Sequence, residues 1–349
     1  MTLPFTLPPR APVAPIRGRT TAEQRGFVGE RTQELPGFEP KWRNIAHYIV
    51  GITEEIWTDA AVDRIRATYA EDCVIHTSMG TSRGIGGVIQ GTIQSMWAYS
   101  AFSTEHLNVA WSQEGDAFYT SHLGFARSTN TGATSLGPAT GGQLARHFVA
   151  DCISRDNKIF LEWLARDSRT GLLQMGLDPV AVARRLAEAP VAEPLEPLAP
   201  DASGLPERGD PSTVEGWVAE LFAAWNARAF ADAAVRYAPD AVAHWPGVRE
   251  ASGPDAIMRL MIGLIASVPD GLFRVEHVCW AEESDGVIVA VRWRLDGVSS
   301  PYGAIGAMPA GRPVAMVGMS HFRFGAEGTV AEEWSVFDDV AVMVQAFRA

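Results

Sequence analysis

The sequence predicts an α+β fold made of two cone-shaped domains, each a curved, mostly antiparallel sheet wrapped on about three helices. Two observations lead to this prediction. The same residues recur in both halves of the 349-residue chain, since Trp57 reappears as Trp225 and His76 as His244, each 168 residues later. Each half also reads as a run of helices followed by a run of strands. A period this long exceeds the roughly 20 to 50 residues of solenoid repeats, so it indicates two copies of one whole domain.

Proline marks the segments outside the two copies. Residues 1–41 form a Pro-rich N-terminal arm, with five prolines in the first fifteen positions, that either stays unstructured or lies over another surface. Residues 188–211 form a Pro-rich linker, because proline at this density is incompatible with helices and sheet ladders. We therefore predict a first domain over 42–187 (the first copy) and a second over 212–349 (the second copy).

The first copy begins with helices. Apolar residues recur at helical spacing over 45–56 and 62–69, and a Gly-rich turn at 84–87 leads into a third helix that ends near Phe102. The remaining segments have strand character or close the copy. They are a short strand at 73–77, long strands at 105–112, 117–128, 143–154 and 158–167, and a short helix near 180–187.

The second copy repeats this order. A helical apolar stripe runs from Val214 to Trp225, a short helix leads to Tyr237, and a third helix includes 258–265. Strands follow the same pattern, one through His244 and four more at 273–280, 287–295, 313–324 and 329–338. A sheet folded over helices in this way should leave one apolar cavity at its open end.

Composition excludes several classes of function. The net charge of −12 argues against nucleic acid or an anionic membrane as a partner. Three cysteines without a CxxC pair predict buried free thiols rather than disulfides or structural zinc. The N-terminus is a poor signal peptide and no apolar stretch could span a bilayer, so we expect a cytoplasmic protein.

Strand periodicity draws attention to the end of the last strand of the first copy. Trp163 and Asp167 fall on one face and Glu162 on the other. If Trp163 faces the cavity, Asp167 does too, and a carboxylate in an apolar pocket can exchange protons with carbon or oxygen near neutral pH. The alternative is an Asp that ends the strand by capping the next turn.

Histidines in strands are further candidates. His76, His122 and His147, with Arg146, could stabilise an oxyanion or shuttle a proton. The alternatives are hydrogen-bonded core histidines and an arginine on the solvent face. The copies differ here, because Val291 and Gly318 occupy the positions assigned to His122 and His147. His76, His122, His147 and Asp167 could also form a metal-ligand set, but no HxH or HExxH spacing is present, so we expect no metal and no cofactor.

Aromatic residues and the second copy complete the candidate set. Most aromatic residues are expected in the cores, with one or two lining a pocket. The candidate substrate-binding residues are Trp163, Trp97, Trp111 and Tyr48. The candidate pocket residues of the second copy are His244, Asp338, Trp334, His321 and Arg292.

A family resemblance follows from one segment. Glu162-Trp163-Leu164-Ala165-Arg166-Asp167, followed by Leu172-Leu173-Gln174-Met175-Gly176-Leu177-Asp178-Pro179, resembles the SnoaL-like polyketide cyclase family of the nuclear transport factor two-like superfamily. The resemblance covers residues 42–187 and, more loosely, 212–349. It implies cofactor-free acid/base catalysis of lyase or isomerase type, with Asp167 as general acid/base and His147 or His122 as its helper.

Three hypotheses remain open at this point. The chain is an enzyme acting on a small apolar or aromatic carbonyl or hydroxy compound, by aldol-type cyclisation or carbon–carbon cleavage, or by dehydration or isomerisation. The alternative is a non-catalytic module for small-molecule binding or dimerisation. In a third reading the first copy is catalytic and the second completes an intrachain pseudo-dimer, and further assembly into a homo-oligomer stays open.

Overall fold

The computed structural model describes residues 2–10, 13, 15–17, 19–26, 31–198 and 209–348. The predicted linker over 188–211 therefore lies partly outside the described residues. The first copy is preceded by α1 (Thr21–Gly26). Its elements are α2 (Ile45–Thr53), the π-helix η1 (Glu54–Thr58), α3 (Arg64–Thr68), β1 (Tyr69–Thr77), β2 (Gly80–Arg83), α4 (Ile85–Ala98), β3 (Tyr99–Glu114), β4 (Ala117–Asn130), β5 (Gln143–Arg155), β6 (Lys158–Arg166), α5 (Ser168–Gln174) and α6 (Pro179–Ala187).

The second copy has the same order of elements, which confirms the predicted α+β class. The third helix of the first copy ends at Ala98, earlier than expected, because Tyr99 already belongs to a strand. The elements of the second copy are α7 (Val214–Asn226), α8 (Phe230–Ala234), β7 (Tyr237–Trp245), β8 (Arg249–Ser252), α9 (Pro254–Ser267), β9 (Leu272–Glu283), β10 (Gly286–Val298), β11 (Pro313–Phe324), β12 (Val330–Phe337) and α10 (Asp339–Arg348).

Each copy contributes six strands to a continuous sheet of order β2-β1-β6-β5-β4-β3-β9-β10-β11-β12-β7-β8. Within each copy the pairing is antiparallel except that β1 runs parallel to β6 and β7 parallel to β12. The two halves join at one pair, Trp111 opposite its own counterpart Trp280. A residue that pairs with its counterpart marks a local two-fold relation between the copies.

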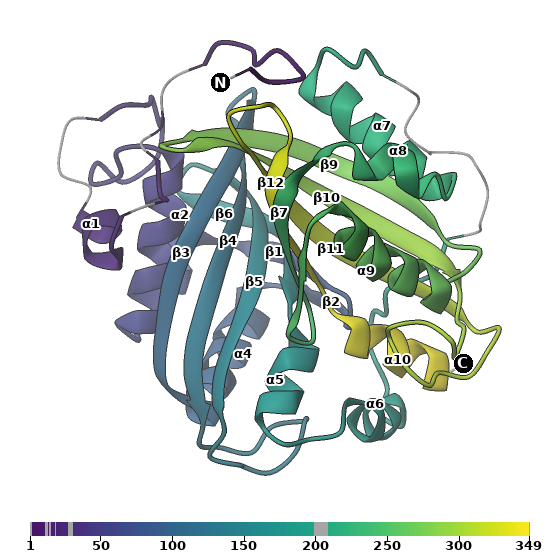
Figure 1. Cartoon of the computed structure of the whole chain (residues 1–349). Helices are drawn as coiled ribbons and strands as arrows, with labels where there is room; N and C mark the ends of the chain where they lie inside the picture. The colour runs from purple at the N-terminus through teal and green to yellow at the C-terminus, as the bar shows by residue number, and fades with distance from the viewer. Residues whose placement is uncertain are drawn as a thin grey trace.

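The two sheets pack against each other through the faces that point away from their helices. Leu123, Val149 and Ala165 of the first copy meet Ile288 and Val317 of the second in one buried cluster. In Figure 1 the strands of both sheets accordingly lie between α2 on the left and α7 to α9 on the right. Both faces of each sheet are thus covered, one by helices and one by the other copy.

The described part of the N-terminal arm lies over both copies. Phe5 packs edge-to-face on Phe324 of the second copy, with ring centroids 5.0 Å apart. Arg10 stacks on Trp111 and Trp280 at the junction and donates to both of their carbonyl oxygens. Of the two expected states of the arm, these residues adopt the one that lies over another surface.

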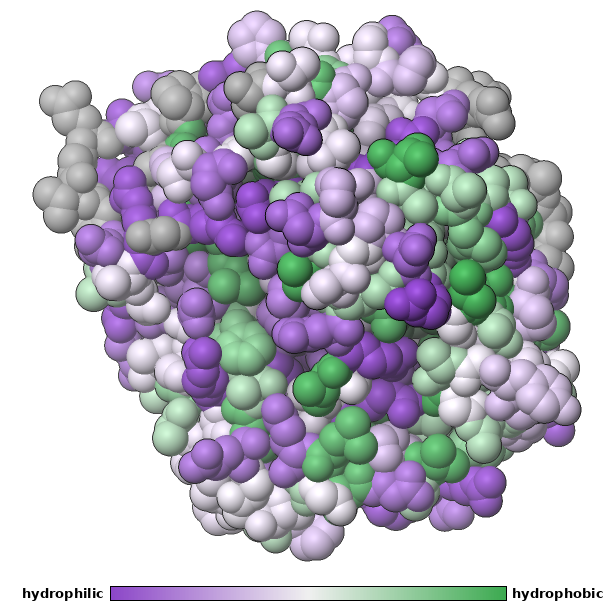
Figure 2. All heavy atoms as spheres, in the orientation of Figure 1, coloured by the Kyte–Doolittle hydropathy of each residue, from purple (hydrophilic) through white to green (hydrophobic). Residues whose placement is uncertain are grey.

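The exterior carries hydrophilic and hydrophobic residues side by side over both copies on the face shown in Figure 2. Among the described residues, no helix combines the length and apolar character needed to cross a membrane.

Candidate active site

The first copy contains a cavity of about 1180 Å³ between its sheet and the helices α2, η1 and α4. Most of the lining is apolar, which suits a ligand with a hydrocarbon or aromatic body. The side chains that could do chemistry are few. The lining residues with ionisable side chains are Tyr69, Tyr99, His122, Arg146, Cys152, Glu162 and Arg166, His147 also borders the cavity, and Thr104 is among the residues that add hydroxyl groups.

His122 is the end of a buried chain of hydrogen bonds that leads away from the cavity. Its Nε2 lies 2.9 Å from Nδ1 of His106, and Nε2 of His106 lies 2.9 Å from Oε1 of Glu54. All three residues are at most 2% exposed. If Glu54 is ionised, His106 donates to it and accepts from His122, which leaves Nδ1 of His122 as a proton acceptor for a ligand.

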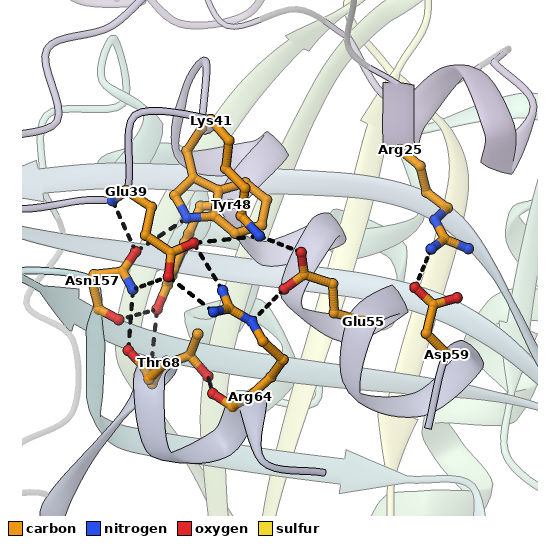
Figure 3. A network of polar contacts seen from close by, with 11 residues as sticks. Arg25, Glu39, Lys41, Tyr48, Glu55, Asp59, Arg64, Thr68 and Asn157 are labelled. Atoms are coloured by element: carbon orange, nitrogen blue, oxygen red, sulfur yellow. Dashed lines mark hydrogen bonds and ion pairs between the residues drawn. The ribbon is translucent and has the colours of Figure 1, made fainter. Parts of the chain in front are cut away.

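The local structure explains how Glu54 reaches this position. It is the first residue of η1, where α2 widens into a π-helical turn, and such turns often occur at functional sites. Arg25 of α1 approaches Glu54 at 3.4 Å and also pairs with Asp59. Figure 3 shows Arg25 directed at Asp59, and Arg64 between Glu39 and Glu55, so ion pairs on both sides fix this turn.

Burial determines the resting charge of His122. Loss of solvent, followed by the charges of His106 and His321, lowers its pKa well below the usual value, so the ring is neutral at physiological pH. A second polar group in the cavity wall is the buried hydroxyl of Thr104, which has no hydrogen-bond partner among the described residues; Thr104 pairs with Ala126, four residues along β4 from His122. The site thus presents a neutral imidazole and an unsatisfied hydroxyl.

In the second copy, apolar residues occupy the positions of His122, His106 and Glu54. His122 pairs with Val109, and their counterparts Val291 and Val278 pair in the same way. The same spacing assigns Val275 to His106 and Phe222 to Glu54. Buried ionisable groups are costly, and the second copy has none of the three.

The two cones carry the bulky ring of one cross-strand pair on different strands. In the first copy Gly124 pairs with Phe148, whereas in the second Trp293 pairs with Gly318. A Cβ atom at Gly318 would lie 2.2 Å from the Trp293 ring, so glycine is required there. This register makes Gly318 the counterpart of Phe148 and not of His147, which corrects the position assigned from sequence spacing alone.

Asp167 does not face the cavity. Its carboxylate caps α5 by accepting from the Thr170 amide at 2.9 Å, and it also accepts from the Gly247 amide of the second copy at 3.2 Å. The expectation that Trp163 and Asp167 share the cavity face is wrong, because Glu162 lines the cavity while Trp163 stacks on Arg292 of the second copy at 3.5 Å. The capping alternative describes the position of Asp167.

The other histidines of the first copy also lie elsewhere. His147 borders the cavity, but its ring packs on Phe125 at 4.8 Å and lies 5.9 Å from His244. His76 stacks on Trp163 and bonds the Thr81 hydroxyl on the outer face. Of the predicted catalytic set, the structure brings only His122 and Arg146 into the cavity with their side chains.

Of the predicted substrate-binding aromatic residues, some line the cavity and others lie elsewhere. Trp97 lines the cavity and is 76% exposed. Tyr48 is a fully buried residue of α2, and Trp111 lies at the junction of the copies. Trp57, which the sequence assigns to the core, lines the cavity next to Phe102, with ring centroids 5.3 Å apart.

The predicted pocket residues of the second copy lie between the copies or at helix ends, not in a second cavity. Arg292 reaches Tyr119 at 2.8 Å and Asp151 at 3.5 Å in the first copy. The remaining four have similar roles. His321 bonds Ser121 and Asn108, His244 stacks on Trp334, and Asp338 accepts from Ser168 and from the Ala341 amide in the first turn of α10.

Sequence reasoning missed Glu54, His106, Thr104 and Arg166. Glu54 and His106 could have been found by the same comparison that selected His122, since each has an apolar counterpart in the second copy. By contrast, Glu162 bonds Tyr69 just as Glu333 bonds Tyr237, so this pair is common to both cones and indicates a structural role. In the part of the chain that the structure describes, no group of three or more His, Cys, Asp or Glu residues is arranged to hold a metal ion.

Comparison with known proteins gives a family and several similar structures. AclR from Streptomyces galilaeus, named as a candidate hydroxylase, is 26% identical over 37% of this chain and 81% of its own, with a TM-score of 0.32. IdmH from Streptomyces antibioticus, named as a candidate polyketide cyclase, is 24% identical over 37% of this chain and 94% of its own, with a TM-score of 0.31. A candidate SnoaL-like polyketide cyclase from Jannaschia sp. CCS1 is 23% identical over 38% of this chain and 90% of its own, with a TM-score of 0.33.

The family match falls in the second copy, although the sequence motif is more complete in the first. A search of curated proteins found no match to the chain. Residues 217–346 match the SnoaL-like polyketide cyclase family. The second copy therefore belongs to the SnoaL-like polyketide cyclase family, and the first copy repeats its order of helices and strands.

Proposed function

We propose that the first copy is an acid/base enzyme that removes and returns a proton at carbon in a small, largely apolar carbonyl compound. The hydrogen-bonded chain Glu54–His106–His122, which ends at the cavity wall, is the observation that supports this function most directly. The family of the second copy is named for cyclases, which fits chemistry of this kind, such as aldol-type ring closure or its reverse.

The hydrogen-bonded chain Glu54–His106–His122 compensates for the weak basicity of His122. A buried imidazole with a depressed pKa is a weak base. If His122 takes the substrate proton on Nδ1, it can pass the proton on its Nε2 to His106, and His106 can pass its own to Glu54. The result is a neutral Glu54 and an enolate, so neither histidine retains a positive charge, and Glu54 is the effective base.

The enolate then needs stabilisation within the cavity. Thr104 pairs with Ala126, four residues along β4 from His122, so its unpaired hydroxyl can donate a hydrogen bond to the oxyanion of a substrate whose conjugated system carries the charge towards it. Return of the proton through the same chain to a different carbon completes an isomerisation. Attack of the enolate on a second carbonyl carbon instead forms a new carbon–carbon bond and an alkoxide, which takes the proton back from Nδ1 of His122. Both outcomes regenerate ionised Glu54.

The test measures proton exchange in the absence of a known substrate. We expect the full-length protein to accelerate deuterium uptake next to the carbonyl of phenylacetone in deuterated water, followed by proton NMR. Glu54→Gln and His122→Ala should each lower this rate at least about 100-fold, because each interrupts the proton path.

Asp167→Asn is the matched control, because an asparagine can keep the cap of α5. It should retain the wild-type rate within a factor of about three. A wild-type rate in Glu54→Gln, or a selective loss in Asp167→Asn with folding intact, would contradict the assignment. Binding of the ketone without any exchange would favour the non-catalytic alternative.

A further inference from the structure

Two arginines line the same cavity without an acidic partner. Arg146 lies on β5 and Arg166 ends β6, and both belong to the cavity wall. Among the described residues, neither guanidinium makes an ion pair with a carboxylate. Glu162 lines the same cavity but bonds Tyr69. A guanidinium has five hydrogen-bond donors and is always charged, so two such groups in one cavity wall can bind an anionic group of a ligand.

Several other arginines with largely buried side chains form ion pairs with carboxylates. Arg292 is paired with Glu276 at 2.9 Å, and Arg169 and Arg249 share Asp339 at 2.6 and 2.7 Å. Buried cations are normally paired in this way because an unpaired charge is costly to bury. Arg146 and Arg166 have no such ion pair among the described residues; the side chain of Arg146 is half-buried and that of Arg166 is exposed, so both are accessible to solvent.

The second copy again provides the comparison. Phe148 pairs with Arg166, and the counterpart Gly318 pairs with Phe337. Arg166 therefore corresponds to Phe337, and the same register assigns Met316 to Arg146. Both cations are replaced by apolar side chains in the cone that is filled, so the fold itself does not need them.

We propose that Arg146 and Arg166 together bind a carboxylate of the ligand, so that the first copy acts on amphiphilic carboxylic acids. Paired guanidinium groups match the planar geometry of a carboxylate and can hold both of its oxygens. Loss of hydration, followed by the charge of Arg146, lowers the pKa of Arg166, whereas Glu162 and Asp338 raise it, and an anion placed between the two arginines would relieve their repulsion.

The layout of the sheet fixes how such a ligand lies. His122 pairs with Ala150 of β5, and Arg146 is four residues away on the same strand and the same face. Four residues of strand span roughly 13 Å between Cα atoms. Phe148 lies between them, with its ring 5.4 Å from that of His122. A ligand held at the arginines would therefore pass over Phe148 and bring its apolar end towards His122.

The position of the reacting end rests on the function proposed above, but the carboxylate site does not. The probes are phenylhexanoate and its amide, phenylhexanamide, which have the same shape and differ in charge. Isothermal titration calorimetry on the full-length protein at neutral pH should show the acid binding at least about tenfold more tightly than the amide.

Substitution then tests which residues carry this preference. The double variant Arg146→Gln/Arg166→Gln should bind acid and amide equally, and because neither arginine forms an ion pair among the described residues it should remain folded by circular dichroism. Arg146→Lys/Arg166→Lys keeps both charges and should retain part of the preference. Arg66→Gln is the matched control, since Arg66 is 61% exposed on α3 outside the cavity, and it should behave as wild type.

The outcomes separate this site from the proposed reaction. His122→Ala should keep the preference for the acid even though it abolishes proton exchange. Equal affinity of the wild-type protein for acid and amide, binding of neither probe, or a preference that persists in the double Gln variant would each overturn the carboxylate site. None of these results would bear on the Glu54–His106–His122 chain.

Discussion

Burial keeps most histidines of this protein neutral, and this links its stability to pH. His321 is fully buried between the copies, where its ring lies 2.9 Å from the Ser121 hydroxyl and 2.6 Å from the Asn108 amide oxygen. Burial lowers its pKa from 6.5 to about 3. His244 behaves in the opposite way, because Glu332 and Glu250 raise its pKa.

Acid should therefore weaken the folded state partly through His321. Below about pH 6.5 the unfolded chain binds a proton at this residue, whereas the folded chain does so only near pH 3, so stability is lost as the pH falls through this window. Each pH unit costs about 1.4 kcal/mol for one such group. In urea unfolding, His321→Asn should lose about 2 kcal/mol less than wild type between pH 7 and pH 5.

His244→Gln is the control for this experiment. Its folded pKa is raised, so protonation of His244 stabilises the folded state as the pH falls, and removal of the residue should not reduce the loss in acid. Parallel stability curves for wild type and His321→Asn would show that His321 does not sense pH in the folded protein.

At the level of single elements, strand periodicity predicted which residues share a face but not which face borders the cavity. Trp163 was correctly placed opposite Glu162, yet Trp163 points outward and Glu162 inward. An apolar aromatic residue indicates a buried face, and in this fold both faces of β6 are buried, one by helices and one by the other copy. The alternation cannot distinguish between them, because the packing of the copies is a long-range property.

Asp167, which follows the last residue of β6, caps α5 and accepts a hydrogen bond from the other copy. We expect Asp167→Ala to lower the free energy of unfolding by about 2 kcal/mol, because it removes the cap and leaves buried donors unpaired. Asp178→Ala is the matched change, as Asp178 is an exposed cap that accepts only from the Val180 amide at 3.0 Å. It should cost about 0.5–1 kcal/mol. Equal losses in chemical denaturation would argue against the contact between the copies.

At the level of the whole molecule, one fold serves two purposes in the same chain. The first cone keeps an open cavity with ionisable residues, and the second fills the same space with Trp293 and its neighbours. The repeat in the sequence was sufficient to predict two cones and their element order. It could not predict the chain through Glu54, because the contact between η1 and β3 joins residues 52 positions apart and depends on a π-helical turn.

The junction of the copies depends on a residue from outside both. Arg10 is sandwiched between Trp111 and Trp280, at 4.1 and 3.3 Å from the two rings, and it donates to both carbonyl groups. Burial lowers its pKa to about 10, so it remains charged at neutral pH. Because β3 and β9 share a single residue pair, this arginine supplies cross-links that the sheet itself lacks.

Loss of this clamp should destabilise the whole molecule rather than one copy. Arg10→Met keeps an unbranched apolar side chain, which is shorter than that of arginine, but removes two hydrogen bonds and two cation–π contacts, and should lower the free energy of unfolding by about 2–4 kcal/mol. The free energy of unfolding of Arg10→Lys should fall between those of wild type and Arg10→Met, because an ammonium group cannot span both carbonyls with a planar fork. Arg66→Met on the exposed face of α3 should change stability by less than about 0.5 kcal/mol. If Arg10→Met unfolded with the wild-type midpoint in urea, the arm would only lie on the junction without holding it.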